Sequence, residues 1–325
     1  MPLNKEFDRT KYAGDRADHI IEDDIRILKM LRWPEEAVDV VIDTDTFNEI
    51  DDQYAIVYAL RSRDRMNVKA IYAAPFDNEK CHGPKEGMEL SYNEIFNILT
   101  LAGEEEIKKN VYSGSTSFLD PNTMEPVDSP AARDLVERAK GYTEEKPLYV
   151  IALGAITNIA SAMLMDPSII NRIVLIWLGG HSFEWSSSHE FNMLQDVASA
   201  RVIFDSKVAL VILPCMGVVS GFATSQPELE YWLKGKNELC DYLVDITIKE
   251  AATHNKIETW TRSIWDVTAV AWLVDPSFEA DRIEHSPIDE FDDHYAFDHS
   301  RHLIRYVYGV KRDLIFKDLF EKLSK

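Results

Sequence analysis

Cysteine and basic residues are both scarce in this chain, and long apolar runs are absent. Its 325 residues include three cysteines, Cys81, Cys215 and Cys240. They lie too far apart for a CxxC pair, which argues against a zinc site or a redox couple built from cysteine. An odd number of widely spaced cysteines is typical of free thiols in a reducing compartment, so we expect a cytoplasmic protein.

The charge balance and the lack of apolar runs exclude further partners. The chain has 35 Lys and Arg residues against 56 Asp and Glu residues, a formal net charge of −21. Nucleic acids and anionic membranes bind basic surfaces, so neither is an expected partner. The longest uncharged stretch, 208–224, contains Pro214, Gly217 and Gly221 and does not resemble a membrane span. The first nine residues lack the apolar core of a signal peptide.

Apolar runs rich in Val and Ile alternate with helical patterns along most of the chain. This alternation predicts a single-domain α/β fold with a mostly parallel open sheet flanked by helices, of Rossmann-like type. We expect the domain to span 37–325, after an N-terminal helical extension at 1–36. The segment 281–302 is expected to be a loop before a last strand, Leu303–Val310, and a last helix. The other expected strands are 38–42, 68–73, 149–153, 173–178 and 208–213, and the other expected helices are 52–62, 91–101, 131–139, 158–165, 197–204, 229–250 and 266–273.

The segment between the first strand and the first helix of this domain is strongly acidic. Its five carboxylates are those of Asp43, Asp45, Glu49, Asp51 and Asp52. Carboxylates this close repel one another, and a hard divalent cation with oxygen ligands would relieve the repulsion. The carboxyl end of a strand in an open α/β sheet is also where ligands bind. A solvated turn with helix-capping acids is the alternative, but it accounts for one or two acids rather than five.

Four segments, in order, resemble those of the inosine-uridine-preferring nucleoside hydrolase family. The acidic loop resembles the family signature DxDPGxDD, with a bridge at 46–50 that is two residues longer. Together the four segments cover about 38–275, and they imply the nucleoside hydrolase type of fold. The other three are YVIALGAITNIA at 149–160, IWLGG at 176–180 followed by HEFN at 189–192, and SIWDVTAVA at 263–271.

The resemblance implies a calcium site and a catalytic base. The metal ligands would be Asp45, Asp52, Asp266 and the main-chain carbonyl of Leu153. Asp51 would accept the proton when the metal-bound water attacks the anomeric carbon. An ordinary acid in the first turn of a helix is the alternative interpretation for Asp266.

Further residues would hold the sugar or support the loop. Glu190, Asn192 and Asn78 match family residues that bind the ribose hydroxyls, and their dipoles suit an oxocarbenium-like transition state. Asp43 would brace the loop from a second-shell position rather than bind the metal. A solvated loop acid is the alternative for Glu190.

The side of the site that would face the base departs from the family pattern. Trp265 stands where the family has the histidine of an HD pair, and an indole can stack on a base but is a poor proton donor. We therefore include Trp265 among the substrate-binding residues and assign no acid for the leaving group. The candidates for that acid are His82, His181, His189, His254 and Arg262.

The predicted function is calcium-dependent hydrolysis of the N-glycosidic bond of a ribonucleoside or related N-riboside, in purine or pyrimidine nucleoside metabolism. The family resemblance also implies a homo-oligomer, a dimer or a tetramer. One alternative is a catalytically impaired relative that binds ribosides. The other is a haloacid-dehalogenase-type phosphatase with Asp43 as nucleophile and Asp45 as acid, although we find no GDxxxD-like segment for that class.

Overall fold

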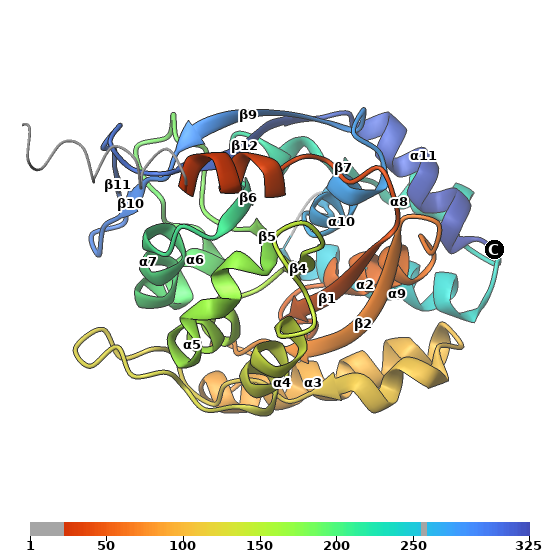
Figure 1. The fold of residues 1–325 in the computed structure, drawn as a ribbon. Coiled ribbons are helices and arrows are strands. Elements are labelled where there is room, and N and C mark those ends of the chain that lie inside the picture. The colour runs from red at the N-terminus through yellow and green to blue at the C-terminus, as the bar shows by residue number, and fades with distance from the viewer. Residues whose placement is uncertain (1–22, 255–258) are drawn as a thin grey trace, which may run out of the picture.

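The computed structural model describes residues 23–254 and 259–325. An eight-stranded sheet runs through it in the order β3-β2-β1-β4-β5-β6-β12-β9 (Figure 1). Neighbouring strands are parallel except β9, which is antiparallel to β12. The predicted α/β class with a mostly parallel open sheet is therefore confirmed. The strands are β1 (Val38–Thr44), β2 (Met66–Ala73), β3 (Val111–Tyr112), β4 (Leu148–Ala152), β5 (Ile173–Leu178), β6 (Ala209–Leu213), β9 (Glu279–His285) and β12 (Leu303–Val310).

Helices cover both faces of this sheet, which is why the inner strands are apolar on both faces. Every residue of β4, β5 and β6 is buried. Two apolar clusters form, one on each side of the sheet. The first packs on α2 (Asp52–Leu60), α3 (Pro84–Leu101), α8 (Gln226–Trp232), α9 (Glu238–His254), α10 (Val267–Val274) and α11 (Arg312–Leu323), and the second on α4 (Pro130–Ala139), α5 (Thr157–Met165), α6 (Phe191–Gln195) and α7 (Val197–Asp205).

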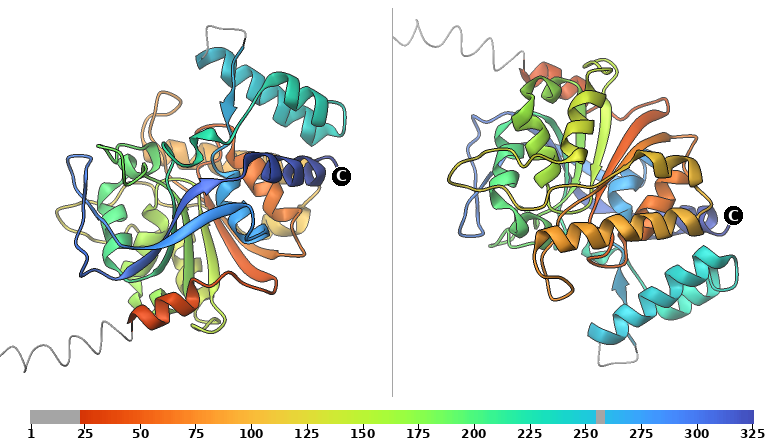
Figure 2. Two further views of the ribbon diagram at one scale, coloured as in Figure 1. Left: turned by 90° about the horizontal axis from the view of Figure 1, so that it is seen from above. Right: turned by 90° about the horizontal axis from the view of Figure 1, so that it is seen from below.

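Some elements differ from the sequence-based expectation. The helix expected at 229–250 is two helices, α8 and α9, because the turn between them includes Gly235 at φ +75°. The two form a pair that projects from the body of the molecule (Figure 2). The loop expected at 281–302 is wrong in part, since 281–285 belong to β9. This edge strand is charged because its outer side has no neighbour in the sheet.

The part of the N-terminal extension that the structure describes is helical and docked. Residues 23–30 form a helix, with Ile27 and Met30 buried in the first cluster. Arg26 donates to the carbonyl of Lys207 at 2.9 Å, which ties the helix to the turn before β6. The rest of the expected extension, 1–22, lies outside the described residues. Among the described helices, none has the length and apolar character needed to cross a membrane.

Candidate active site

The acidic loop leaves the carboxyl end of β1 at the middle of the sheet. β1 pairs with β2 on one side and β4 on the other, so the loop lies between the ends of three strands. Asp45, Asp51 and Asp52 are each at most 2% exposed. Gly154, just after β4, lets the loop approach closely, because a Cβ at this position would lie 2.9 Å from Cγ of Asp45. The carboxylates are therefore held inside the protein and not on a solvated turn.

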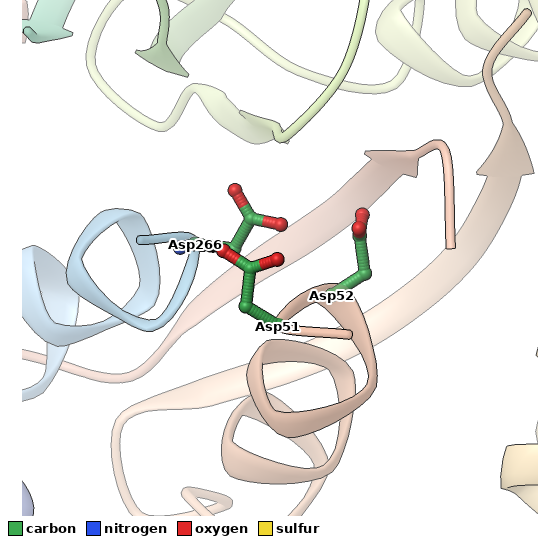
Figure 3. A group of neighbouring side chains, drawn as sticks. All are labelled: Asp51, Asp52 and Asp266. Carbon is green, nitrogen blue, oxygen red and sulfur yellow. Dashed lines mark hydrogen bonds between the residues drawn. The ribbon is translucent and has the colours of Figure 1, made fainter. Parts of the chain in front are cut away.

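A further acid, Asp266, reaches this loop from the start of a second helix. Asp51 precedes α2 and Asp266 precedes α10, and neither side chain caps its own helix within the described structure. Instead, Oδ2 of Asp51 accepts a hydrogen bond from the main-chain N–H of Asp266 at 3.2 Å. Figure 3 shows Asp51, Asp52 and Asp266 projecting from the two helix starts toward one another. One carboxylate oxygen of each lies within 4.8 Å of those of the other two.

A cavity of about 200 Å³ opens over these carboxylates. Eight of the ten predicted site residues line it, namely Asp45, Asp51, Asp52, Leu153, Glu190, Asn192, Trp265 and Asp266. The lining also includes Glu49 of the acidic loop and two candidates for the leaving-group acid, His181 and His189. The remaining lining residues, for which the sequence predicted no role, are Asn48, Leu178, Phe191 and Cys215.

Burial and mutual repulsion raise the pKa values of the acids in the absence of a cation. Burial raises the pKa of Asp52 to about 6, and hydrogen bonds from Thr44 and Asp266 oppose the shift. Burial, and then the charges of neighbouring acids, raise the pKa values of Asp45, Asp51 and Asp266 well above the ordinary value. The group of acids is therefore costly to ionise until a positive charge joins it.

Glu190 and Asn192 are fixed by main-chain groups at one wall of the cavity. Glu190 caps α6 and accepts hydrogen bonds from the N–H groups of Asn192 and Met193. It also accepts one from Gly180 at 2.8 Å, and Gly180 adopts φ +72° to make the turn. The amide of Asn192 donates to the carbonyl of Leu153 at 2.9 Å. This places the Leu153 carbonyl, a predicted metal ligand, at the same wall.

Two predicted residues lie behind the cavity rather than in it. Asp43 is fully buried, and its carboxylate accepts a hydrogen bond from the amide of Asn158 at 2.8 Å. A group this enclosed has no access to a substrate, which argues against its use as a phosphatase nucleophile. Asn78 donates to Oδ1 of Asn48 at 2.8 Å. Asn48 lines the cavity and Asn78 does not, so Asn78 contacts the cavity wall through Asn48.

The longer bridge of the acidic loop is held from two sides. Lys80 donates to the carbonyl of Asn48 at 2.5 Å. On the other side, Nη2 of Arg262 lies 2.7 Å from Oε2 of Glu49. This ion pair is not an aligned hydrogen bond, since Nη2 has no hydrogen-bond partner among the described residues. Spacing along the chain could not reveal these contacts, because they join segments far apart in sequence.

The histidine candidates for a leaving-group acid separate into two sets. His181 and His189 line the cavity. His82 is exposed and lies outside the lining, and the side chain of His254 lies outside the described residues. Burial lowers the pKa of His181, which favours the neutral ring. His189 is bound through Nδ1 to Asp293 at 2.8 Å.

The oxygen atoms around the cavity suit a hard divalent cation. Oδ2 of Asp45 is buried and has no hydrogen-bond partner in the described part of the chain. Asp51, Asp52 and Asp266 add carboxylate oxygens at mutual distances that one ion can bridge. The donors are all oxygens of the kind that calcium and magnesium prefer.

Residues 40–301 match the family model of the inosine-uridine preferring nucleoside hydrolases. The chain belongs to this family. Nucleoside hydrolases are metal-dependent enzymes of the glycosidase class that act on N-ribosyl bonds. The family and the enzyme class that the sequence predicted are therefore confirmed.

Several known nucleoside hydrolases resemble the chain in sequence or fold. It is 24% identical over 264 residues to the pyrimidine-specific ribonucleoside hydrolase RihA of Citrobacter koseri, covering 74% of this chain and 80% of the relative. It is 33% identical over 135 residues to the probable uridine nucleosidase 2 of Oryza sativa subsp. japonica, a match that covers 39% of this chain and 40% of that relative's length.

Solved structures show the same fold. A plant nucleoside hydrolase superposes with a TM-score of 0.73 at 20% identity, over 90% of this chain and 99% of that one. The purine-preferring ribonucleoside hydrolase of Gardnerella vaginalis gives 0.68 at 20% identity, over 88% and 98%. The relatives whose names mention a base include uridine, pyrimidine and purine enzymes, so these names do not identify the base that this nucleoside hydrolase accepts.

Proposed function

We propose that this nucleoside hydrolase uses calcium to hydrolyse the N-glycosidic bond of a ribonucleoside or a related N-riboside. One observation carries the proposal: Asp51, Asp52 and Asp266 converge from two helix starts at the floor of a cavity. Glu190 and Asn192 line the same cavity, so a cation and polar groups for a sugar would lie side by side.

Each group has a distinct task in the proposed reaction. Asp45, Asp52, Asp266 and the Leu153 carbonyl would hold the ion, which polarises a bound water and lowers its pKa. Asp51 accepts the proton of the attacking water. Its Oδ2 is oriented by the N–H of Asp266, which leaves the other oxygen for that proton.

The walls of the cavity hold the ribose while positive charge develops at the anomeric carbon. The Asn192 amide is fixed by the Leu153 and Leu178 carbonyls, and its oxygen remains to accept a hydrogen bond from a sugar hydroxyl. Asn78 supports this arrangement through Asn48. The negative charges of Asp51 and Glu190 stabilise an oxocarbenium-like state.

Asp43 supports the loop from behind. Its carboxylate is bound by Asn158, and its carbonyl accepts a hydrogen bond from the N–H of Leu153 at 2.8 Å. Replacement of Asp43 would therefore act through the position of Asp45 and Leu153 and not through contact with substrate.

The test is a reducing-sugar assay of the purified protein with uridine, cytidine, inosine, adenosine and nitrophenyl riboside, each with calcium and with EDTA. We expect ribose release that EDTA abolishes and calcium restores. Binding of ribosides without ribose release from any of them would identify a binding protein and overturn the proposal. If magnesium restored the activity as well as calcium does, the assignment of calcium would be refuted, but the proposed reaction would stand.

A further inference from the structure

The cavity carries a surplus of negative charge that one metal ion does not cancel. Six carboxylates line it, those of Asp45, Glu49, Asp51, Asp52, Glu190 and Asp266. Among the described residues, no lysine or arginine lines it. With a cation bound and all six groups ionised, a divalent ion would cancel two of the six formal charges, and Arg262, which pairs with Glu49, would cancel a third. The site therefore stays negative where a substrate must enter.

The cavity also has a poor supply of protons for a departing base. Trp265 lines it where a proton donor would be useful, and an indole does not donate its proton to a leaving group. His181 accepts a hydrogen bond at Nδ1 from the N–H of Met216, and its ring lies against Trp185. The His189 ring is more than half exposed and is bound to Asp293. His181 therefore has only its Nε2–H to donate, and the His189 ring lies largely in solvent, so neither histidine is an enclosed acid at the cavity.

We infer that this site, taken as the riboside hydrolase proposed above, selects N-ribosides whose base carries a fixed positive charge. N-ribosyl pyridinium and N-alkylated purine ribosides are members of this class. The carboxylates attract the cation, the face of Trp265 provides a cation–π contact, and the leaving base needs no proton.

The chemistry of such a substrate balances without an acid. The water oxygen forms a bond to the anomeric carbon, and its proton passes to Asp51 and then to solvent. The bond from the anomeric carbon to nitrogen breaks, and its electron pair moves onto the ring nitrogen, which cancels the positive charge of the base. The products are ribose, a neutral base and one proton.

One of the carboxylates at the cavity, that of Glu49, can be neutralised without removing a proposed ligand of the ion. Glu49 lies in the bridge at 46–50, and its side chain is 36% exposed at the cavity. Glu49 is not one of the proposed ligands of the ion. Glu49→Gln removes one negative charge at the entrance and leaves Arg262 with the more distant charges of Asp51 and Glu250, so the entrance becomes more positive.

Two measurements test the inference. The first compares kcat/KM for N-ribosyl nicotinamide, uridine, inosine and nitrophenyl riboside. The second measures inhibition constants for a pyridine C-riboside and its N-methyl pyridinium form, which cannot be cleaved and differ mainly in charge. We expect the cationic C-riboside to bind about tenfold more tightly at low salt, since interactions of this kind fall with ionic strength.

The variants separate charge from packing. Glu49→Gln should remove most of the preference for the cationic C-riboside. Glu137→Gln, which removes the same charge from the exposed side of α4, should leave it unchanged. Trp265→Phe should retain part of the preference for the cationic C-riboside, and Trp265→Leu should lose that part. Only an aromatic face attracts the cation.

Equal inhibition by the two C-ribosides would overturn the inference, even if nitrophenyl riboside were cleaved and the proposed function stood. Faster cleavage of uridine or inosine than of N-ribosyl nicotinamide would also overturn it. If no riboside were cleaved, the proposed function would fail, and the dissociation constants of the two C-ribosides, measured by calorimetry, would still decide whether the cavity selects a cation.

Discussion

At the scale of single residues, Asp51 has one carboxylate oxygen oriented by the main-chain N–H of Asp266, which lies on another helix start. Replacement by asparagine keeps the shape and an acceptor oxygen for the N–H of Asp266. The amide is far less basic than a carboxylate and cannot take a proton from water, so we expect kcat to fall by about 10²–10⁴-fold. Steady-state kinetics with nitrophenyl riboside measures the loss.

Calcium titration followed by calorimetry provides the control for Asp51→Asn, because the fold and a measurable calcium affinity should persist. Turnover at the parental rate would show that the base lies elsewhere. Loss of both turnover and calcium binding would instead make Asp51 a ligand of the ion.

Gly154 permits the closest backbone approach to the site. A methyl group here would lie within about 3 Å of three Asp45 atoms, and the buried Asp45 side chain has little room to move. We expect Gly154→Ala to weaken calcium binding by at least tenfold, a loss of about 1.4 kcal/mol. Calcium titration measures this loss. Gly141→Ala is a suitable control, because the nearest atom to a Cβ there is 3.5 Å away. An unchanged calcium affinity in Gly154→Ala would argue against Asp45 as a ligand.

At the scale of the elements, β9 begins with a buried acid, Glu279, that has no hydrogen-bond partner among the described residues. Neither carboxylate oxygen of Glu279 has a hydrogen bond within the described chain, and burial followed by repulsion from Asp281 raises its pKa well above the ordinary value. Glu279→Met, which is similar in size and apolar, should stabilise the protein by about 1–3 kcal/mol at neutral pH. Urea unfolding gives the free energy.

The stabilisation by Glu279→Met should shrink as the pH falls toward the ordinary pKa of glutamate, where both states hold the proton. Glu284→Met in the same strand is the control, because Glu284 is partly exposed and paired with Arg282 at 2.6 Å. A destabilised Glu279→Met protein would imply that the carboxylate has a favourable role.

The central elements were predictable because their patterns are local. β1 and β4–β6 are continuous Val- and Ile-rich runs, and α2 and α5 are the next elements along the chain after β1 and β4. The break between α8 and α9 was not predictable from periodicity, since apolar residues continue on both sides of Gly235. β9 was missed because an edge strand needs no apolar alternation, and only its pairing with β12 defines it.

At the scale of the whole molecule, the raised pKa values make stability depend on pH and on the cation together. In metal-free protein, burial raises the pKa values of Asp43 and Glu190 to about 7 and of Asp52 to about 6. Between the ordinary value and these raised values, the unfolded chain is ionised while the folded chain still holds protons. The free energy of unfolding must therefore fall as the pH rises through this range.

We accordingly expect a higher Tm near pH 5 than near pH 8 in EDTA. Calcium should raise Tm more near pH 8, because binding requires the ionised carboxylates. Scanning calorimetry measures both effects. Asp52→Asn in EDTA should have a higher Tm than the parent near pH 8. A calcium-induced rise in Tm that is larger near pH 5 would contradict the assignment of carboxylate ligands.

The composition of the site could be predicted only in part from the sequence. Four segments in family order identified the acids and the Glu190–Asn192 turn, and the structure brings most of them to one cavity. The contacts between Asn48 and Asn78, and between Glu49 and Arg262, depend on how distant loops meet. No local pattern encodes such contacts.

The link between Asp51 and Asp266 joins positions 215 residues apart. Contacts of such long range form late, after most of the loop-closure entropy has been lost. The three-carboxylate group therefore does not exist in a chain that has yet to dock α10, including one still emerging from the ribosome. Calcium should slow unfolding and leave the folding rate nearly unchanged, which stopped-flow kinetics in denaturant would show. The ion then determines how long a folded molecule lasts rather than how fast a new one forms.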